Sequence, residues 1–220
     1  MAADGLGDGP GKVGEEDWAA YVRRTAARLR IAPGSSVLEV GCGSGAFLYE
    51  LYRQGCAVSG IDRSPTLIEY ARQAMPEGRF DVADASELEP GEPVDAVVSF
   101  GVFLYFPSQA YARRVLRRMA AGARQVVAVL DLPDRSRQAE DLARRQQLAG
   151  GAEAYEELYR GLTHLYFDRA WFARTLEECG LTGVEIADQE LAGYSHAPFR
   201  FNAWGFAPAD REAPRAIRRG

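Results

Sequence analysis

Short apolar runs alternate with amphipathic segments along most of the chain, and polar or glycine-rich turns separate them. Short apolar runs are typical of buried strands, whereas apolar residues spaced three and four apart indicate helices. The predicted strands are 37–40, 57–62, 78–82, 94–100, 125–130, 183–189 and about 199–206. Helices are predicted at 15–30 and 108–120, and directly after Gly45, Ser64 and Asp168. This alternation predicts an α/β fold.

The first predicted strand runs into a turn with glycine at every second position, Gly41-Cys42-Gly43-Ser44-Gly45. Glycine accepts backbone angles that a Cβ forbids, and it lets a ligand lie directly against the main chain. The helix that follows offers free N–H groups at its start. The turn therefore predicts a nucleotide-like cofactor, and its fit to the loose dinucleotide fingerprint leaves NAD open.

Three carboxylates lie at or just beyond the ends of the first three predicted strands, in order. Glu39 lies two residues before the first glycine, where a pyrophosphate binder would gain nothing from a negative charge. Asp62 ends the second strand at the usual offset for an acceptor of ribose hydroxyl hydrogen bonds, and helix capping is the alternative. Asp84 would be an ordinary loop residue if it stood alone, and its significance comes from its place after Glu39 and Asp62.

The string Glu39-Val40-Gly41-Cys42-Gly43-Ser44-Gly45 resembles motif I of the class I S-adenosylmethionine-dependent methyltransferases. The resemblance extends over about residues 15–207. It implies a Rossmann-like three-layer sandwich with a seven-stranded, mostly parallel sheet, an antiparallel last strand and a small helical cap. It also implies S-adenosylmethionine as the cofactor, with Asp84 and the Ala85 backbone at the adenine.

In that family the N-terminal helix closes over the cofactor, and the resemblance gives this role to Trp18 and Tyr21; a core-packing role stays open. The expected cofactor-binding residues are Trp18, Tyr21, Glu39, Gly41, Cys42, Gly43, Gly45, Asp62, Arg63, Asp84, Ala85, Ser99 and Phe100.

Candidates for the acceptor side follow the fourth strand, because ligands of open α/β sheets lie off the carboxyl ends of strands. Tyr105 stands where the resembled family has a histidine. His164 has a suitable unperturbed pKa for a base, with a structural role open, and it ranks above His196. Asn202 lies in an apolar strand and needs a partner, in the site or in a core network. The expected catalytic residues are Tyr105, Asp131, His164, Tyr166 and Asn202.

The domain organisation is predicted from breaks in this pattern. Residues 14–207 form one methyltransferase-like domain, and the excursion at about 132–167 is a lid or substrate-binding cap. Residues 1–13 are Gly- and Asp-rich, which predicts disorder, and 208–220 form a charged, loose tail.

The net charge and the composition argue against several classes of binding partner. The 220 residues carry a net charge of −5, whereas a binder of phosphate backbones should show a basic face. Neither a signal peptide nor a membrane-length apolar run stands out. The three cysteines show no metal spacing. We expect a cytoplasmic protein with reduced thiols, a small-molecule substrate, no metal, no nucleic acid and no membrane partner; a homodimer stays open.

Together these features predict an enzyme that transfers a methyl group to oxygen or nitrogen of a small metabolite, in secondary or sugar metabolism. Such a displacement requires mainly that the nucleophile and the methyl carbon be held in contact. One alternative is attack at another carbon of the sulfonium, which would form azetidine-2-carboxylate and release methylthioadenosine. An NAD enzyme and a protein that only senses the cofactor are further alternatives.

Overall fold

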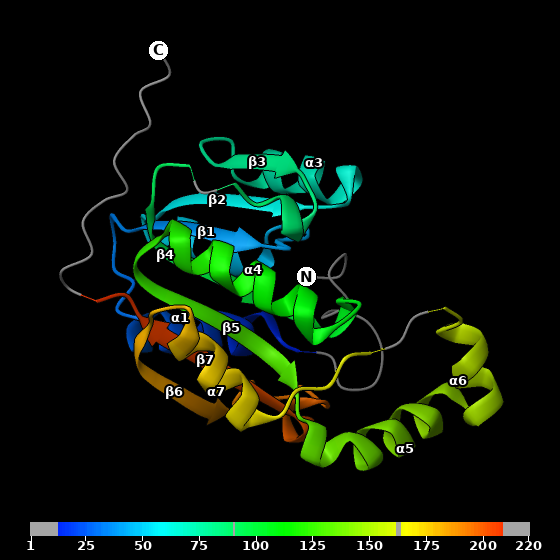
Figure 1. The fold of residues 1–220 in the computed structure, drawn as a ribbon. Helices are drawn as coiled ribbons and strands as arrows, with labels where there is room; N and C mark the ends of the chain where they lie inside the picture. The colour runs from blue at the N-terminus through cyan, green and yellow to red at the C-terminus, as the bar shows by residue number, and fades with distance from the viewer. Residues whose placement is uncertain (1–12, 90, 162–163, 209–220) are drawn as a thin grey trace.

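The computed structural model describes residues 13–89, 91–161 and 164–208, and these residues form a seven-stranded sheet (Figure 1). The strand order is β3-β2-β1-β4-β5-β7-β6. The strands are β1 (Ser36–Val40), β2 (Ala57–Asp62), β3 (Arg79–Val82), β4 (Val94–Phe100), β5 (Ala123–Pro133), β6 (Thr182–Asp188) and β7 (Arg200–Phe206). Strands β1 to β5 pair in parallel, and β7 runs antiparallel between β5 and β6. The predicted α/β fold with an antiparallel last strand is confirmed.

Helices cover both faces of the sheet. One apolar cluster contains residues of α1, α2 and α3, and the cluster on the other face contains residues of α4 and α7. Alternate residues of β5 serve the two faces: Val126 and Ala128 point into the first cluster, Val127 and Val129 into the second. The bounds are α1 (Glu15–Arg28), α2 (Ala46–Arg53), α3 (Pro65–Ala74), α4 (Gln109–Gly122), α5 (Gln138–Ala149), α6 (Ala152–Leu158) and α7 (Arg169–Glu178).

Side-chain caps begin three of these helices, at residues that the sequence marks. The Ser64 hydroxyl accepts a hydrogen bond from the Leu67 N–H, and Pro65 opens α3. Ser108 caps α4 and the Asp168 carboxylate caps α7 in the same way. Each cap satisfies an N–H that has no partner inside its helix.

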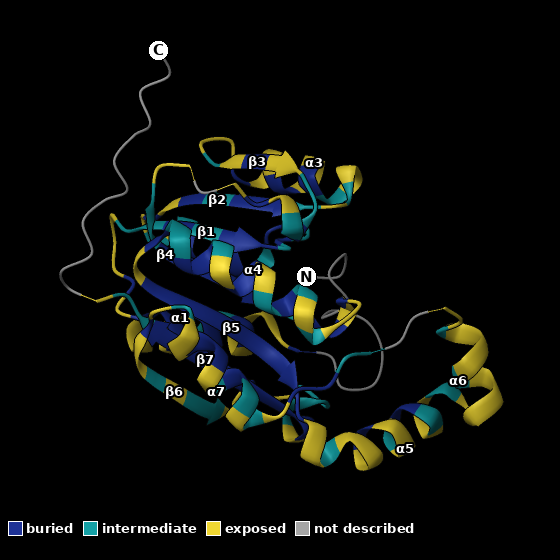
Figure 2. Cartoon of the chain, in the orientation of Figure 1, coloured by how far each residue is buried: buried dark blue, intermediate teal, exposed yellow. Residues whose placement is uncertain are grey.

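The segment between β5 and α7 extends beyond the edge of the sheet (Figure 1). Helices α5 and α6 are exposed over most of their surface (Figure 2), but Asp141 and Arg145 on α5 are buried. Short 3₁₀ turns lie at η2 (Ala85–Glu87), η3 (Phe103–Tyr105), η4 (Arg135–Arg137) and η5 (Ala197–Phe199). The buried residues of α5 therefore lie on the side of the helix that faces the body of the protein.

The predictions for the two ends concern residues that lie mostly outside the described ones, namely 1–12 and 209–220. Val13, which the prediction of disorder included, is buried to 2% exposure in the same cluster as Trp18. None of the described helices has the combination of length and apolarity that spanning a bilayer requires.

Candidate active site

A cavity of about 1190 Å³ opens at the carboxyl ends of β1, β2, β4 and β5. This is the edge at which open parallel sheets bind ligands. Its walls fall into two parts. The first, here called the glycine-turn half, contains Trp18, Glu39, Gly41, Cys42, Gly43, Asp62, Arg63, Asp84, Ala85 and Phe100. The second, called the arginine half, contains Tyr105, Asp131, Arg145, Tyr159, His164, Tyr194, His196 and Arg200.

The glycine turn is fastened to the end of β2. The N–H groups of Gly41 and Cys42 both donate to the Ile61 carbonyl, at 2.8 and 3.0 Å. Gly41 has φ +76°, and a Cβ there would clash with the Val102 side chain. A Cβ on Gly60 would lie 2.6 Å from the Cys42 sulfur, so a glycine in β2 makes room for Cys42. The turn requires glycine at Gly41 for both its backbone angle and its packing.

Gly45 has a different role from Gly41 and Gly43. Its φ is +86°, and a Cβ there would clash with the Met75 methyl group. Gly45 lines a separate hollow between α1, α2 and α3 and is not part of the cavity wall. The third glycine of the turn therefore packs α2 closely against α3.

Asp62 connects the turn to the helix that follows β2. Its Oδ2 accepts from the Gly43 N–H at 2.9 Å, and its Oδ1 accepts from the Ser64 N–H at 2.8 Å. A carboxylate has about four acceptor sites, so Asp62 retains acceptor capacity toward the cavity. Glu39 is 2% exposed and lines the same cavity from β1.

Asp84 is held in place at the start of η2. Its carboxylate accepts from the N–H and hydroxyl of Ser86 and from the Tyr111 hydroxyl. These hydrogen bonds, with Ser86 first, hold the pKa of Asp84 below its usual value. The largely exposed Arg63 lies 3.8 Å from this carboxylate. Asp84 and Ala85 both line the cavity, and they complete a row of carboxylates with Glu39 and Asp62.

Aromatic side chains close the glycine-turn half from α1 and β4. The Trp18 indole N–H donates to the Ala46 carbonyl at 3.0 Å, and its ring meets Phe100 edge-on at 5.1 Å. Tyr21 stacks behind Trp18 and is 3% exposed, away from the cavity wall. Ser99 is fully buried and donates to the Val40 carbonyl at 2.8 Å, which joins β4 to β1. Tyr21 and Ser99 thus support the wall, whereas Trp18 and Phe100 form it.

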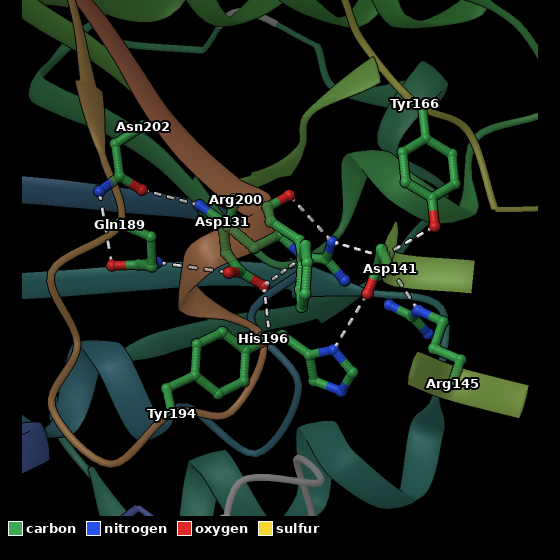
Figure 3. Close-up of polar contacts among 10 residues, drawn as sticks. Asp131, Asp141, Arg145, Tyr166, Gln189, Tyr194, His196, Arg200 and Asn202 are labelled. Carbon is green, nitrogen blue, oxygen red and sulfur yellow. Dashed lines mark hydrogen bonds and ion pairs between the residues drawn. The ribbon is translucent and has the colours of Figure 1, made fainter. Parts of the chain in front are cut away.

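Asp131 marks the start of the arginine half, and its φ of +62° is unusual for a residue with a side chain. Its carboxylate accepts from the Tyr194 hydroxyl at 3.0 Å and from the Gln189 amide at 3.3 Å (Figure 3). Its N–H donates to Asn202 Oδ1 at 2.9 Å. Asn202 is buried and lies off the cavity wall, so its contacts are those of the core network that the sequence left open.

Asp141 on α5 is fully buried, and its two oxygens have different partners (Figure 3). Arg200, Arg145 and the Tyr166 hydroxyl donate to Oδ2 at 3.0, 3.1 and 2.7 Å. His196 Nδ1 lies 3.3 Å from Oδ1. Burial alone would raise the pKa of Asp141, but the His196 hydrogen bond and the two guanidinium charges hold it well below its usual range. The carboxylate is therefore ionised at neutral pH.

His164 lines the cavity from the segment that precedes α7. Burial, followed by the charges of Arg145 and Arg200, lowers the pKa of His164 to about 4. Its ring lies 5.8 Å from that of Tyr105, which is 59% exposed. A general base works best when its pKa lies near the working pH, so His164 is better suited to hydrogen bonding than to proton abstraction.

The cavity wall contains Arg145, Tyr194 and Arg200, which the sequence did not single out as functional, and the lower-ranked His196. Asp141, also not singled out, lies behind the wall and pairs with Arg200. Tyr166, a predicted catalytic residue, is instead a partner of Asp141 behind the wall. Arg200 was a sequence signal that could have revealed this cluster, because a charged residue in an apolar strand requires a buried partner. Asp141, its partner, lies 59 positions earlier in the chain.

Comparison with known proteins agrees with this geometry. A family model described as a methyltransferase domain matches residues 37–125. The chain is 31% identical over 107 residues to the dTDP-4-amino-2,3,4,6-tetradeoxy-D-glucose N,N-dimethyltransferase of Saccharopolyspora spinosa, covering 47% of this chain and 43% of that protein. It is 32% identical over 83 residues to the trans-aconitate 2-methyltransferase of an Enterobacter species, covering 37% and 33%. The matched region thus spans less than half the length of these curated relatives.

Two solved structures have a similar fold. The N-methyltransferase NodS of Bradyrhizobium japonicum, in complex with S-adenosylhomocysteine, matches with a TM-score of 0.65 and 20% identity, covering 92% of this chain and 90% of that one. The magnesium protoporphyrin IX methyltransferase of Synechocystis with bound S-adenosylmethionine matches with a TM-score of 0.62 and 17% identity, covering 87% and 80%. The fold is therefore the Rossmann-like methyltransferase fold. The match over residues 37–125 and the fold both agree with the resemblance to class I S-adenosylmethionine-dependent methyltransferases that motif I carries.

Proposed function

We propose that this protein transfers the methyl group of S-adenosylmethionine to an oxygen or nitrogen atom of a small molecule. One observation carries the proposal: Glu39, Asp62 and Asp84 line the same cavity as the glycine turn, and this cavity continues into the arginine half. The cofactor has a cationic sulfonium, an ammonium group, two ribose hydroxyls and an adenine amino group. All of these except the sulfonium can donate hydrogen bonds, and ionised carboxylates only accept them.

The residues of the glycine-turn half have distinct roles in this proposal. The acceptor sites of Asp62 that its backbone partners leave would receive the ribose hydroxyls. Asp84 and the Ala85 backbone would meet the adenine, and Glu39 would face the ammonium group of the amino acid end. Trp18 and Phe100 would cover the cofactor and exclude water. When bound, S-adenosylmethionine supplies an electrophilic methyl carbon, and the protein positions the acceptor in line with the departing sulfur.

The proposed acceptor is a small metabolite, in secondary or sugar metabolism. The curated relatives above are named for a nucleotide-linked amino sugar and for trans-aconitate, both of which are small molecules. The acceptor side of the cavity is lined by side chains from several segments, among them Asp131 of β5, Arg145 of α5 and Arg200 of β7, which suits a compact ligand better than a polymer. All the relatives above are named methyltransferases, which favours methyl transfer over release of methylthioadenosine.

The test measures cofactor binding and turnover separately. Calorimetry should show binding of S-adenosylhomocysteine and none of NADH, and a panel of acceptors should then be incubated with S-adenosylmethionine. S-Adenosylhomocysteine and methylthioadenosine are quantified in parallel. Acceptor-dependent formation of the first supports the proposal. Methylthioadenosine without an acceptor would indicate the cyclising alternative, and binding without turnover on any acceptor would indicate a sensor.

A further inference from the structure

The chain contains two histidines, and both line the arginine half. They differ in what holds them. His164 Nδ1 lies 3.3 Å from the Tyr155 hydroxyl, a group that can either donate or accept. His196 Nδ1 lies 3.3 Å from the Asp141 carboxylate, which can only accept. Only the His196 imidazole therefore has a hydrogen-bond partner that fixes its tautomer.

We propose that His196, oriented by Asp141, is the general base that removes a proton from the methyl acceptor. This inference rests on the proposed function, and it narrows the acceptor class to a compound with an ionisable hydroxyl or amine. Because the buried Asp141 is ionised, Nδ1 must carry the hydrogen of the His196–Asp141 bond. The lone pair is then on Nε2, on the opposite edge of a ring that lines the cavity and whose side chain is 22% exposed.

The two oxygens of Asp141 have different roles in this arrangement (Figure 3). Oδ2 takes the donors that fix the carboxylate in place, Arg145 from α5, Arg200 from β7 and the Tyr166 hydroxyl. Oδ1 contacts the imidazole. A carboxylate that contacts one ring nitrogen fixes the tautomer and orientation of the ring and stabilises the imidazolium that forms. Asp141 is therefore a positioning residue, and the residue that would contact the acceptor is His196.

Charged groups of both signs surround His196. Asp141 contacts its ring directly and is paired with Arg145 and Arg200, and Asp131 lies 3.8 Å from Arg200. The Tyr194 ring meets the imidazole edge-on at 5.6 Å, and its hydroxyl donates to Asp131. Two guanidinium groups and two carboxylates thus surround the imidazole, and the ring lines the cavity. At His164, burial and the same arginines lower the pKa to about 4.

The movement of protons and electrons during methyl transfer indicates which chemical class of acceptor needs a base. A lone pair of the acceptor oxygen or nitrogen forms the bond to the methyl carbon, and the carbon–sulfur bond breaks with its electron pair going to sulfur. The acceptor's proton passes to His196 Nε2 and then to solvent. A carboxylic acid is already ionised at neutral pH and has no proton to give. The His196–Asp141 pair therefore suits a hydroxyl or amine acceptor, and a carboxylate acceptor would not need it.

The tautomer can be tested without knowing the acceptor. Full-length protein with ¹⁵N-labelled histidine, saturated with S-adenosylhomocysteine, should show two imidazole spin systems, which His164→Gln assigns. We expect Nδ1 of His196 to be protonated and Nε2 to be unprotonated at neutral pH. The opposite tautomer in the wild-type protein would overturn the proposal, and this holds even if no acceptor is found.

Turnover tests the catalytic role. Phenols, alcohols, amines and carboxylic acids are screened with S-adenosylmethionine, and formation of S-adenosylhomocysteine is measured. With a hydroxyl or amine acceptor, His196→Gln should lower kcat by about 100-fold or more, the usual contribution of a general base. S-Adenosylhomocysteine affinity should stay within about twofold, since the base does not contribute to ground-state cofactor binding. In the wild-type enzyme kcat should also fall toward acid pH, and the variant should lose that dependence.

His164→Gln is the matched control, because it removes the other imidazole of the same cavity. Its kcat should fall by less than about tenfold, since a hydrogen-bonding role contributes less than proton abstraction. Unchanged kcat in His196→Gln, or turnover on carboxylic acids alone, would overturn the inference while leaving methyl transfer intact. Failure of the wild-type protein to bind S-adenosylhomocysteine would instead overturn the proposed function.

Discussion

The two halves of the cavity are built in opposite ways. The glycine-turn half takes its carboxylates from residues 39–85, at or just beyond the carboxyl ends of β1, β2 and β3, and its Asp62–Gly43 hydrogen bond joins residues 19 positions apart. The arginine half joins α5 to β7, where Arg200 and Asp141 are 59 positions apart. The first half depends on local backbone geometry. The second exists only once distant segments have packed.

The halves also differ in charge. Carboxylates predominate in the glycine-turn half, and Arg63, the cation among its wall residues named above, is largely exposed. In the arginine half, Arg145 and Arg200 are paired with Asp131 of the wall and with the buried Asp141 behind it. The negative half suits a cationic cofactor, whereas the arginine half suits an acceptor that changes its protonation state. The family model covers residues 37–125, which include nearly all of the first half and end before Asp131.

The largest expected effect on stability comes from Asp141→Asn. This variant should distinguish the two halves most clearly, because it removes a buried contact of the arginine half alone. Removing one partner of a buried ion pair leaves uncompensated charge and costs about 3–5 kcal/mol of unfolding free energy. Urea unfolding measures this loss, and the affinity for S-adenosylhomocysteine of the protein that remains folded should change little. Glu140→Gln on the same helix is the control, since Glu140 is 62% exposed and the expected change is within about 0.5 kcal/mol. Equal effects of the two variants would mean that the buried cluster does not stabilise the fold.

Gly41→Ala should damage the glycine-turn half selectively. The new methyl group would clash with Val102 at a backbone angle that favours glycine, and overpacking of this kind costs about 1–3 kcal/mol. S-Adenosylhomocysteine affinity should fall together with stability, while the His196 imidazole signals should stay in place. Gly34→Ala is the control, because its φ is +89° but nothing lies within 4 Å of the added Cβ. If Gly41→Ala bound S-adenosylhomocysteine as tightly as the wild type, the role assigned to the turn would be contradicted.

Asp62→Ala should weaken the binding of S-adenosylhomocysteine by about 1–3 kcal/mol, because bound hydroxyls would lose a charged acceptor. The substitution also releases the Gly43 and Ser64 N–H groups, so Asp62→Asn, which keeps one acceptor oxygen, should lose less. Calorimetry provides both affinities. Unchanged affinity in Asp62→Ala would remove the ribose assignment and leave Asp62 as a structural residue.

The smallest effect is a pH dependence of stability that arises from His164. Its pKa is lowered to about 4 in the folded protein, and the unfolded chain takes up a proton near pH 6.5. Between these values the unfolded state binds more protons, so unfolding free energy should fall as pH drops from about 6.5 toward 4, by about 1–2 kcal/mol for a half-buried group. His164→Gln should remove this part of the dependence. Parallel stability curves for the two proteins would contradict it.

The sequence predicted the first half well because its signals are local. The bounds of β2 and β4 match the prediction, and Ser64 and Asp168 cap helices where expected. Strand β5 runs to Pro133, beyond the predicted end at residue 130, because Leu132 and Pro133 pair with β7. That extension depends on a neighbour that the local sequence does not specify.

The second half was predicted poorly for the same physical reason. Asp141 and Arg145 lie on a helix whose composition is polar, and nothing local shows that one side of it is buried. His196 ranked below His164, because the aspartate that orients it and the arginines that lower the pKa of His164 come from other segments. The packing behind the wall, where Tyr21 and Ser99 lie, likewise required the tertiary structure.

The position of Trp18 gives the protein a built-in optical probe. The indole forms part of the cavity wall and is tied to the Ala46 carbonyl, whereas Trp171 and Trp204 belong to α7 and β7 and do not line the cavity. A ligand that enters the glycine-turn half therefore alters the surroundings of one of the three tryptophans. Intrinsic fluorescence should report occupancy directly, without a dye or label.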